Sequence, residues 1–399
     1  MEDGKFSRMQ MQILSACFIV YFCAYIGRLN LSASLDSIMR DMKVLETAGG
    51  TLQTVFAIVY AAGQFVFGAI VDRLSPKKMI ITGLLGSALS NVLFSIAQSF
   101  TLLCVLWALN GAFQAMLWTP IVRTIALNFT GKRRQRASFT MSFTLAGGHL
   151  AAWGLAVKIR QLVGWRQAFM IPCFVLMFAA AIAFFLLPNA DRNKTSKDTE
   201  KAQKAGAPKA SVRFLFTTGL LFVLVSAVTN GFLRDGVITW GPTILGMEEG
   251  MFTLIIPLIN LFAILAGATI VRAFNTRVRS IAGFMMAFCL IPSILLYSFS
   301  ASPVWALALM LGLMSAILYG SNTLYTALMP MEYDKSGRVG LVAGLIDSFI
   351  YVGSALAGTL TGFMRETMGS WKGVYAVWIF ASILGAACML ISVRGAKKL

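Results

Sequence analysis

Two arginines, Arg28 and Arg234, lie inside long apolar segments of the chain, residues 11–35 and 214–243. A charge in the hydrocarbon of a membrane is costly, so an ionisable residue inside a span marks a candidate functional site. The guanidinium group offers a planar fork of donors that matches the oxygens of phosphate or carboxylate. Each arginine falls in the first long apolar segment of its half of the chain. We therefore expect the two arginines to hold one anion between two related halves.

Polar and aromatic side chains accompany both arginines at helical spacing. Tyr21 and Tyr25 share a helix face with Arg28, and Asn230 lies one turn before Arg234. Polar faces on other segments complete the expected substrate-binding set, which adds Tyr60, Gln64, Trp118, His149, Tyr319 and Asn322. Each of these further residues is open to a second interpretation, because polar side chains also join helices inside membranes.

The acid that follows Arg234 bears on the same site. Asp235 is the next residue, and on a helix it is expected to point about 100° away from Arg234. The alternative to anion binding is a permanent ion pair of Arg234 with Asp235 or with Asp347.

A second set of residues has the chemistry expected of gating or coupling: Asp72, Arg73, Arg123, Asp347 and Tyr351. Asp347 is a carboxylate inside an apolar segment and could take up a proton, or it could simply neutralise Arg234. His149, the only histidine, could sense pH or donate to a phosphate, and it could equally be packed against a neighbouring helix. For Arg123, packing or gating is favoured over ligand contact.

These residues must be positioned by membrane-spanning helices. The chain of 399 residues is 58% hydrophobic and 13% charged, and apolar segments of about 20 residues, the length that spans a bilayer as a helix, recur throughout. The sequence predicts an all-α polytopic membrane protein with twelve transmembrane helices in two six-helix halves. The expected spans are 10–36, 50–71, 79–98, 101–127, 137–158, 166–188, 214–243, 250–272, 280–300, 302–330, 338–363 and 371–393.

The predicted halves are residues 1–188 and 214–399, joined by a polar, lysine-rich cytoplasmic linker at 189–213. A short internal repeat supports the division: Gly68-Ala-Ile-Val-Asp-Arg73 ends the second span, and Gly267-Ala-Thr-Ile-Val-Arg272 ends the eighth. Repeated halves around a central site are a common design of transporters.

The basic residues indicate orientation. With the N-terminus placed inside, 24 of the 34 Lys and Arg residues fall on the cytoplasmic side, 7 on the external side and 3 within spans. This bias predicts a multi-pass cell-membrane protein with both termini in the cytoplasm. It also explains the net charge of +18 without nucleic acid, which we exclude as a partner. No cleavable signal peptide is evident.

Other function classes find no support in the sequence. The six cysteines all fall in expected spans and show neither CxxC pairing nor metal-ligand spacing, which favours a packing role. We find no GxxxxGK[ST] loop, no HExxH motif and no pair of catalytic carboxylates. We therefore expect no enzyme activity, no catalytic residues, no metal and no cofactor.

A longer motif resembles a known family. The segment Gly68-Ala-Ile-Val-Asp-Arg-Leu-Ser-Pro-Lys-Lys78 is similar to the loop between spans two and three of the major facilitator superfamily. Within that superfamily the chain resembles the organophosphate:phosphate antiporter family in three segments. These are Tyr25-Ile-Gly-Arg-Leu-Asn30, Trp118-Thr-Pro-Ile-Val-Arg-Thr124 and Arg234-Asp-Gly-Val-Ile-Thr-Trp-Gly-Pro-Thr243. The resemblance implies the major facilitator fold, with Arg28 and Arg234 gripping the phosphate of the substrate.

Two positions depart from the family pattern. Gln64 stands where family members often have a lysine, and the family's fifth-span histidine aligns near Thr144 rather than His149. These departures leave open a smaller or less charged anion. The first-span pattern is also similar to that of the anion:cation symporters, although Gly27 replaces the acid that usually precedes the arginine there.

The sequence therefore predicts a secondary active transporter that exchanges an organophosphate for inorganic phosphate by alternating access, acting as a monomer in the lipid bilayer. Two alternatives stay open. One is a proton-coupled symporter of an organic carboxylate such as a sugar acid, and the other is a transporter-like organophosphate sensor.

Overall fold

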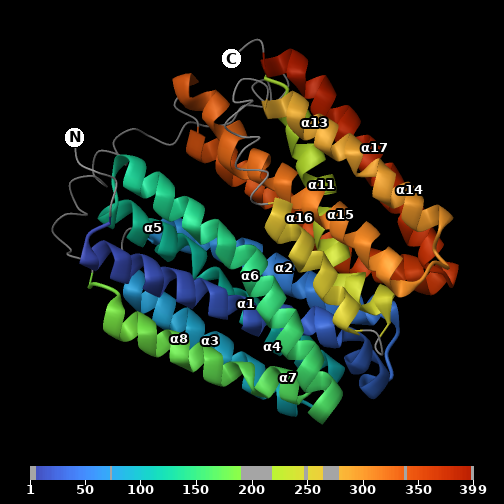
Figure 1. Ribbon diagram of the computed structural model, residues 1–399, viewed down its shortest axis with the longest axis horizontal. Helices are drawn as coiled ribbons and strands as arrows, with labels where there is room; N and C mark the ends of the chain where they lie inside the picture. Colours follow the sequence, from blue (N-terminus) through green and yellow to red (C-terminus); the bar gives the residue numbers. More distant parts are fainter. Residues whose placement is uncertain are drawn as a thin grey trace. The chain divides into compact units, whose positions relative to one another are not determined.

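The computed structural model describes residues 6–71, 74–189, 218–246, 250–263, 278–336 and 339–396. Every regular element in these ranges is helical (Figure 1). Within the described ranges, ten helices are long and apolar enough to cross a membrane, and they match ten of the twelve expected spans. The expected fifth span is the more polar helix α6 (Gly131–Val163), and the expected eighth is represented by the shorter apolar helix Phe252–Ala263. The prediction of an all-helical polytopic membrane protein is confirmed.

The chain forms two compact units, and each is described by itself. The first comprises Met1–Ile38 and Ile58–Ala205, and the second comprises Met39–Ala57 and Gly206–Leu399. The expected linker at 189–213 lies almost wholly outside the described residues. The sequence did not predict that the first part of the second span belongs with the second unit.

The first unit contains, wholly or in part, the helices α1 (Arg8–Met42), α2 (Glu46–Ile70), α3 (Pro76–Ile96), α4 (Phe100–Ala115), α5 (Trp118–Asn128), α6, α7 (Gln167–Met170) and α8 (Pro172–Leu186). The end of α1 and the first part of α2 belong to the second unit. Helix α3 packs against both α4 and α8 (Figure 1). The fourth expected span is broken into α4 and α5 at Met116. Pro120 explains the break, because its ring clashes with the carbonyl four residues earlier and it has no N–H to donate.

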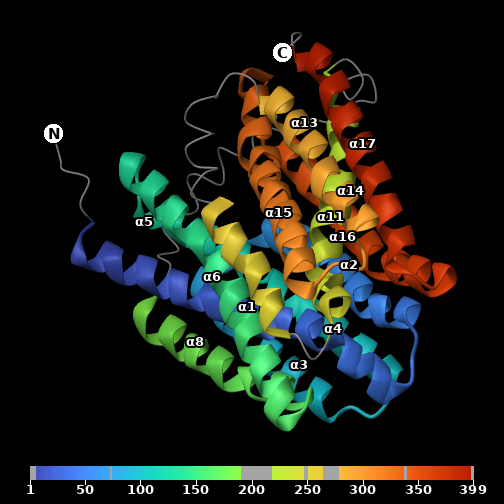
Figure 2. The ribbon, with the colours of Figure 1, turned by 45° about the vertical axis from the view of Figure 1, so that its right-hand side comes forward.

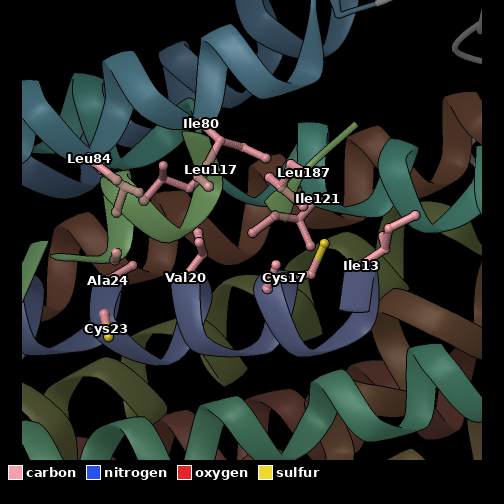
Figure 3. Close-up of a cluster of buried hydrophobic side chains, with 14 of the residues drawn as sticks. Ile13, Cys17, Val20, Cys23, Ala24, Ile80, Leu84, Leu117, Ile121 and Leu187 are labelled. Carbon is pink, nitrogen blue, oxygen red and sulfur yellow. The ribbon is translucent and has the colours of Figure 1, made fainter. Parts of the chain in front are cut away.

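The core of the first unit is built on one stripe of α1. Ile13, Cys17, Val20 and Ala24 recur at helical spacing and are buried against α3 and α5, as Figure 3 shows for Ile80, Leu84, Leu117 and Ile121. Cys17 and Cys173 both belong to this core.

Helices of the second unit are α11 (Leu220–Leu245), η1 (Gly250–Leu254), α13 (Val278–Phe288), α14 (Leu290–Ser298), α15 (Val304–Thr323), the π-helical turn η2 (Leu324–Leu328), η3 (Met329–Ser336), α16 (Val339–Met368) and α17 (Trp371–Ala396). Helix α11 is central to this unit, since α15, α16 and α17 all pack on it (Figure 2). This position explains why α11 carries buried side chains all around its circumference.

Close backbone contact between α11 and α16 depends on two glycines. A Cβ atom at Gly231 would meet the carbonyl oxygen of Ile350, and one at Gly353 would meet that of Val228. Small residues of this kind let helices in membranes approach closely. The contact brings α16 beside the turn of α11 that carries Arg234.

Candidate functional site

In the first unit, Arg28 lies on α1 against an aromatic ring. Its guanidinium carbon is 4.6 Å from the centre of the Tyr60 ring, and Tyr60 is only 2% exposed. The Tyr60 hydroxyl accepts a hydrogen bond from Gln64 Nε2 at 2.7 Å, and Gln64 Oε1 accepts one from Thr119 at 2.9 Å. Three of the expected site residues are therefore brought together, with the cation over a ring face in favourable geometry.

The backbone that precedes Arg28 is held by buried amides from α3 and α4. Asn91 and Asn110 both donate to the carbonyl of Gly27, at 3.1 and 3.0 Å. Gln114 donates to the carbonyl of Ala24 at 3.1 Å. These three amides fix the turn of α1 from which Arg28 projects. The sequence analysis placed none of these three amides in the candidate site, because their carbonyl partners lie on another helix.

A row of aromatic rings joins four more expected residues. Ring centres are 4.8 Å apart for Trp118 and Tyr21, 5.2 Å for Tyr21 and Tyr25, and 5.1 Å for Tyr25 and His149. Tyr25 and His149 are buried, whereas Trp118, at the start of α5, is partly exposed. The row links α5, α1 and α6 through side chains that have apolar faces and polar edges.

His149 is 3% exposed, and its Nδ1 lies 2.7 Å from the carbonyl oxygen of Leu145. Because a carbonyl only accepts, Nδ1 must carry the proton. A neutral ring then presents Nε2 as an acceptor, so donation from Nε2 to a phosphate requires the charged, doubly protonated ring. The packed-histidine interpretation and the ligand interpretation both remain compatible with this geometry.

In the second unit, Arg234 is bound by an acid. Its Nε donates to Asp235 Oδ1 at 2.8 Å and its Nη2 donates to Asp235 Oδ2 at 3.1 Å. The third contact is from Nη1 to Asn322 Oδ1 of α15, at 2.8 Å. The expected offset of about 100° between these neighbouring residues does not keep their side chains apart, because the long arginine side chain bridges it. Of the two ion pairs considered as alternatives, the one with Asp235 is present.

Tyr319, Asp347 and Tyr351 surround the same arginine. The Arg234 guanidinium carbon is 5.8 Å from the centre of the Tyr319 ring on α15. On α16, both Asp347 and Tyr351 lie close enough to interact electrostatically with Arg234. Among the residues that the structure describes, Asp347 forms no salt bridge. The structure therefore brings Arg234, Tyr319, Asn322, Asp347 and Tyr351 into one cluster.

Asn230 is fully buried and joins two helices. Its Nδ2 donates to Ser321 Oγ at 2.7 Å and to the carbonyl of Leu318 at 3.3 Å, both on α15. Its Oδ1 has no partner among the described residues. The amide nitrogen thus positions α11 against α15, one turn before Arg234.

Three expected gating residues lie away from these clusters or outside the described structure. Arg123 on α5 donates from Nη1 to the carbonyl of Leu74 at 3.2 Å, which anchors the loop before α3. Asp72 and Arg73 lie outside the described residues.

The sequence analysis did not single out a further arginine of the second unit. Arg279 was counted only among the basic residues of the cytoplasmic side, and the structure shows it 2% exposed, with partners on η3, on α17 and just before α11. Its Nε donates to Glu332 at 2.7 Å, and its Nη1 donates to the carbonyls of Thr218 and Ser392 at 2.8 Å each. Charge counting could not distinguish it from a solvated arginine, because its carbonyl partners come from distant parts of the chain.

Apolar helices of membrane-spanning length, arranged in two units with arginines embedded in each, define a multi-pass membrane protein with buried cationic sites. Residues 17–357 match the family model of the Major Facilitator Superfamily, and the chain belongs to this family.

Curated relatives narrow the comparison. The glycerol-3-phosphate transporter of Bacillus subtilis (strain 168) is 25% identical, over 99% of this chain and 95% of that protein. The phosphoglycerate transporter protein of Salmonella typhimurium is 25% identical, over 100% of this chain and 92% of that protein. The membrane sensor protein UhpC of Escherichia coli (strain K12) is 22% identical, over 97% and 93%. The predicted resemblance to the organophosphate:phosphate antiporter family is thereby confirmed.

Solved structures support the fold. A bacterial homologue of the human lysosomal transporter Spinster, in an inward-facing and occupied conformation, aligns with a TM-score of 0.75 at 14% identity. The alignment covers 99% of this chain and 97% of that one. The major facilitator fold implied by the sequence motifs is confirmed.

Proposed function

We propose that this protein carries an organophosphate anion across the cell membrane in exchange for inorganic phosphate, by alternating access. The observation that carries the proposal is the pair of embedded arginines, Arg28 and Arg234, each held among aromatic and amide side chains by hydrogen-bonded helices. Two relatives over nearly the full chain are named as transporters of glycerol 3-phosphate and phosphoglycerate. Both named substrates carry a phosphoryl group.

The chemistry of the arginines suits this substrate class. A phosphoryl group carries about −1.5 to −2 charges near neutral pH, which matches two guanidinium groups. Arginine binds phosphate oxygens through two parallel N–H donors, so it fixes orientation as well as charge. The aromatic row of Trp118, Tyr21, Tyr25 and His149 offers ring faces and polar edges to the organic part of the substrate.

The test uses purified protein in liposomes preloaded with inorganic phosphate, with labelled organic phosphates and organic acids screened outside. Uptake of an organophosphate that depends on internal phosphate supports the proposal. Arg28→Lys and Arg234→Lys are each expected to abolish this uptake, because lysine cannot supply the bidentate fork. Arg394→Lys, at an exposed position near the end of α17, is the control. Normal exchange by either of the first two variants contradicts the proposal.

A proton-coupled symporter of an organic carboxylate is the second candidate, favoured by the position of Asp347. This acid is half-buried in α16 near Arg234 and outside any described salt bridge, so it or His149 could carry the proton. An uncoupler distinguishes the two candidates. Collapse of the proton gradient stops symport and spares phosphate exchange.

A sensor is the third candidate, since one relative is named as a membrane sensor protein. Measurable flux into vesicles that contain only this protein excludes a purely sensory role. We further propose that both termini lie in the cytoplasm, on the basis of the bias of basic residues toward that side. A monomer is proposed because one chain carries both arginine clusters.

A further inference from the structure

Asp235 occupies the edge of Arg234 that would otherwise bind an oxyanion. The two carboxylate oxygens lie 2.8 Å from Nε and 3.1 Å from Nη2, which is the side-on bidentate arrangement that phosphate oxygens also adopt. The side chains of Arg234 and Asp235 are only 10% and 11% exposed. The pair is therefore largely withdrawn from water, where its charges are poorly screened.

From this geometry we propose that Asp235 is a resident counter-anion of Arg234, which stands in for the substrate when the carrier is empty. Asp235 thereby determines the rate of net movement, in which the carrier returns without an anion, relative to the rate of strict exchange, in which it returns with one. The inference rests on the proposed function, because it concerns the coupling of the same anion transport.

The position of Asp235 in the sequence supports this role. Asp235 follows Arg234 on the same helix, so rearrangement of one helix against another does not separate the pair. Asp347 belongs to α16 and depends on helix packing for its distance from Arg234. Only a competing anion, such as the phosphoryl group of a substrate, displaces Asp235 from the Nε–Nη2 edge.

The cost of enclosing an unpaired charge explains how the Arg234–Asp235 ion pair affects transport. An arginine enclosed in a low-dielectric site without a partner is strongly unfavourable. If Arg234 had no resident acid, enclosing the empty site would carry this cost, and the carrier would change conformation only with an anion bound. Asp235 neutralises Arg234 before any substrate binds. The empty carrier can therefore change conformation and return to the other side of the membrane.

The same pair also has an effect on affinity. A substrate oxyanion must displace Asp235 to reach the Nε–Nη2 edge of Arg234. Asp235 therefore raises the anion concentration needed for half-maximal exchange while it permits net movement. Replacement of Asp235 should therefore strengthen anion binding and at the same time reduce net movement, a combination that a purely structural role does not predict.

The experiment measures labelled inorganic phosphate leaving proteoliposomes, once into phosphate-free buffer and once into buffer with external phosphate. The first rate reports net movement and the second reports exchange. Wild-type protein is expected to show both. In Asp235→Asn we expect the ratio of net movement to exchange to fall about tenfold or more, which corresponds to ~1.4 kcal/mol in a barrier. The phosphate concentration for half-maximal exchange should fall as well. Asp41→Asn, at an exposed acid near the end of α1, is the matched control.

A charge-relocation variant keeps the test informative if Asp235→Asn folds poorly. In the double variant Asp235→Asn/Asn322→Asp, the new carboxylate takes the place of an oxygen that lies 2.8 Å from Arg234 Nη1. Arg234 is then neutralised again, but its Nε–Nη2 edge is left to the substrate. We expect the ratio of net movement to exchange to recover, and the half-maximal concentration to stay below that of wild type.

The outcomes separate the two proposals. Wild-type protein that shows no phosphate exchange of any kind overturns the proposed function. Wild-type exchange without net efflux overturns the role of Asp235. An unchanged ratio of net movement to exchange in a folded Asp235→Asn also overturns the role of Asp235. So does a double variant that exchanges phosphate but does not recover this ratio.

Discussion

The guanidinium of Arg28 lies 4.6 Å from the centre of the Tyr60 ring, and the hydroxyl of the same tyrosine accepts a hydrogen bond from Gln64. Tyr60 thus supports the cation with its face and fixes the amide with its edge. Because α2 carries both Tyr60 and Gln64 one helical turn apart, a single helix face organises this part of the candidate site.

Removal of the Tyr60 ring is expected to weaken anion transport through the position of Arg28. A cation–π contact in a desolvated site contributes about 2 kcal/mol, so Tyr60→Ala should raise the half-saturating substrate concentration about thirtyfold. Tyr60→Phe keeps the ring and loses only the hydroxyl, and it should have a clearly smaller effect. Initial rates of labelled substrate uptake in proteoliposomes measure both. Equal effects of the two variants would show that the hydroxyl, not the ring, matters.

The buried amides that hold the backbone next to Arg28 are expected to stabilise the fold. Asn91 donates to the carbonyls of Gly27 and Ser87 and accepts from Asn30, so Asn91→Ala leaves buried polar groups without partners. A loss of about 1–3 kcal/mol is expected. The apparent unfolding temperature of detergent-purified protein should fall accordingly. Gln98→Ala, at an exposed position just beyond α3, should leave it unchanged, and an equal temperature for both variants would contradict the assignment.

Periodic apolar segments and the placement of basic residues were sufficient to predict the helical membrane fold, because both patterns reflect the bilayer itself. The two embedded arginines were also identifiable, since a charge in an apolar run stands out from its neighbours. Their partners were identifiable only in part. The Arg234–Asp235 pair was one of two ion pairs that the sequence left open, because the choice between Asp235 and Asp347 depends on side-chain conformation. The contacts of Asn91 depend on which helices become neighbours, and the spacing of residues along one helix does not encode this.

The assignment of the first part of α2 to the second unit has a physical reason that sequence patterns did not reveal. A Cβ atom at Gly358 of α16 would meet the carbonyl oxygen of Gly50 on α2, and it would lie 2.7 Å from Thr54 Oγ1. Thr54 Oγ1 also donates to the carbonyl of Ala355 at 2.6 Å. Glycine at position 358 therefore permits direct backbone contact between α2 and α16.

Replacement of Gly358 by alanine is expected to force α2 and α16 apart. Overpacking of this kind costs about 1–3 kcal/mol. Gly344 is a matched control on the same helix, because a Cβ atom there meets nothing within 4 Å. Gly344→Ala should be neutral or stabilise the helix by up to ~1 kcal/mol. The unfolding temperature of Gly358→Ala should therefore fall, while that of Gly344→Ala should rise or stay unchanged. A shift of equal sign and size in both would show that the close contact is unimportant.

Of the described basic residues of the second unit, Arg279 is expected to be the one whose substitution lowers stability most. All three of its nitrogens are bound, to Glu332, to Tyr333 and to the carbonyls of Thr218 and Ser392. Arg279→Gln removes these contacts and leaves Glu332 without its cation, and breaking a buried ion pair in this way costs about 3–5 kcal/mol. We expect poor yield of folded protein and a markedly lower unfolding temperature by differential scanning fluorimetry.

Two comparisons isolate the cause of that loss. Arg394→Gln, at an exposed position on α17, removes the same charge and should leave stability unchanged. Arg279→Gln combined with Glu332→Gln removes both members of the pair, so it should recover part of the stability lost in the single variant, since no unpaired carboxylate remains. A double variant less stable than Arg279→Gln alone would mean that Glu332 stabilises the fold through contacts other than Arg279, and the ion pair would no longer explain the sensitivity of this position.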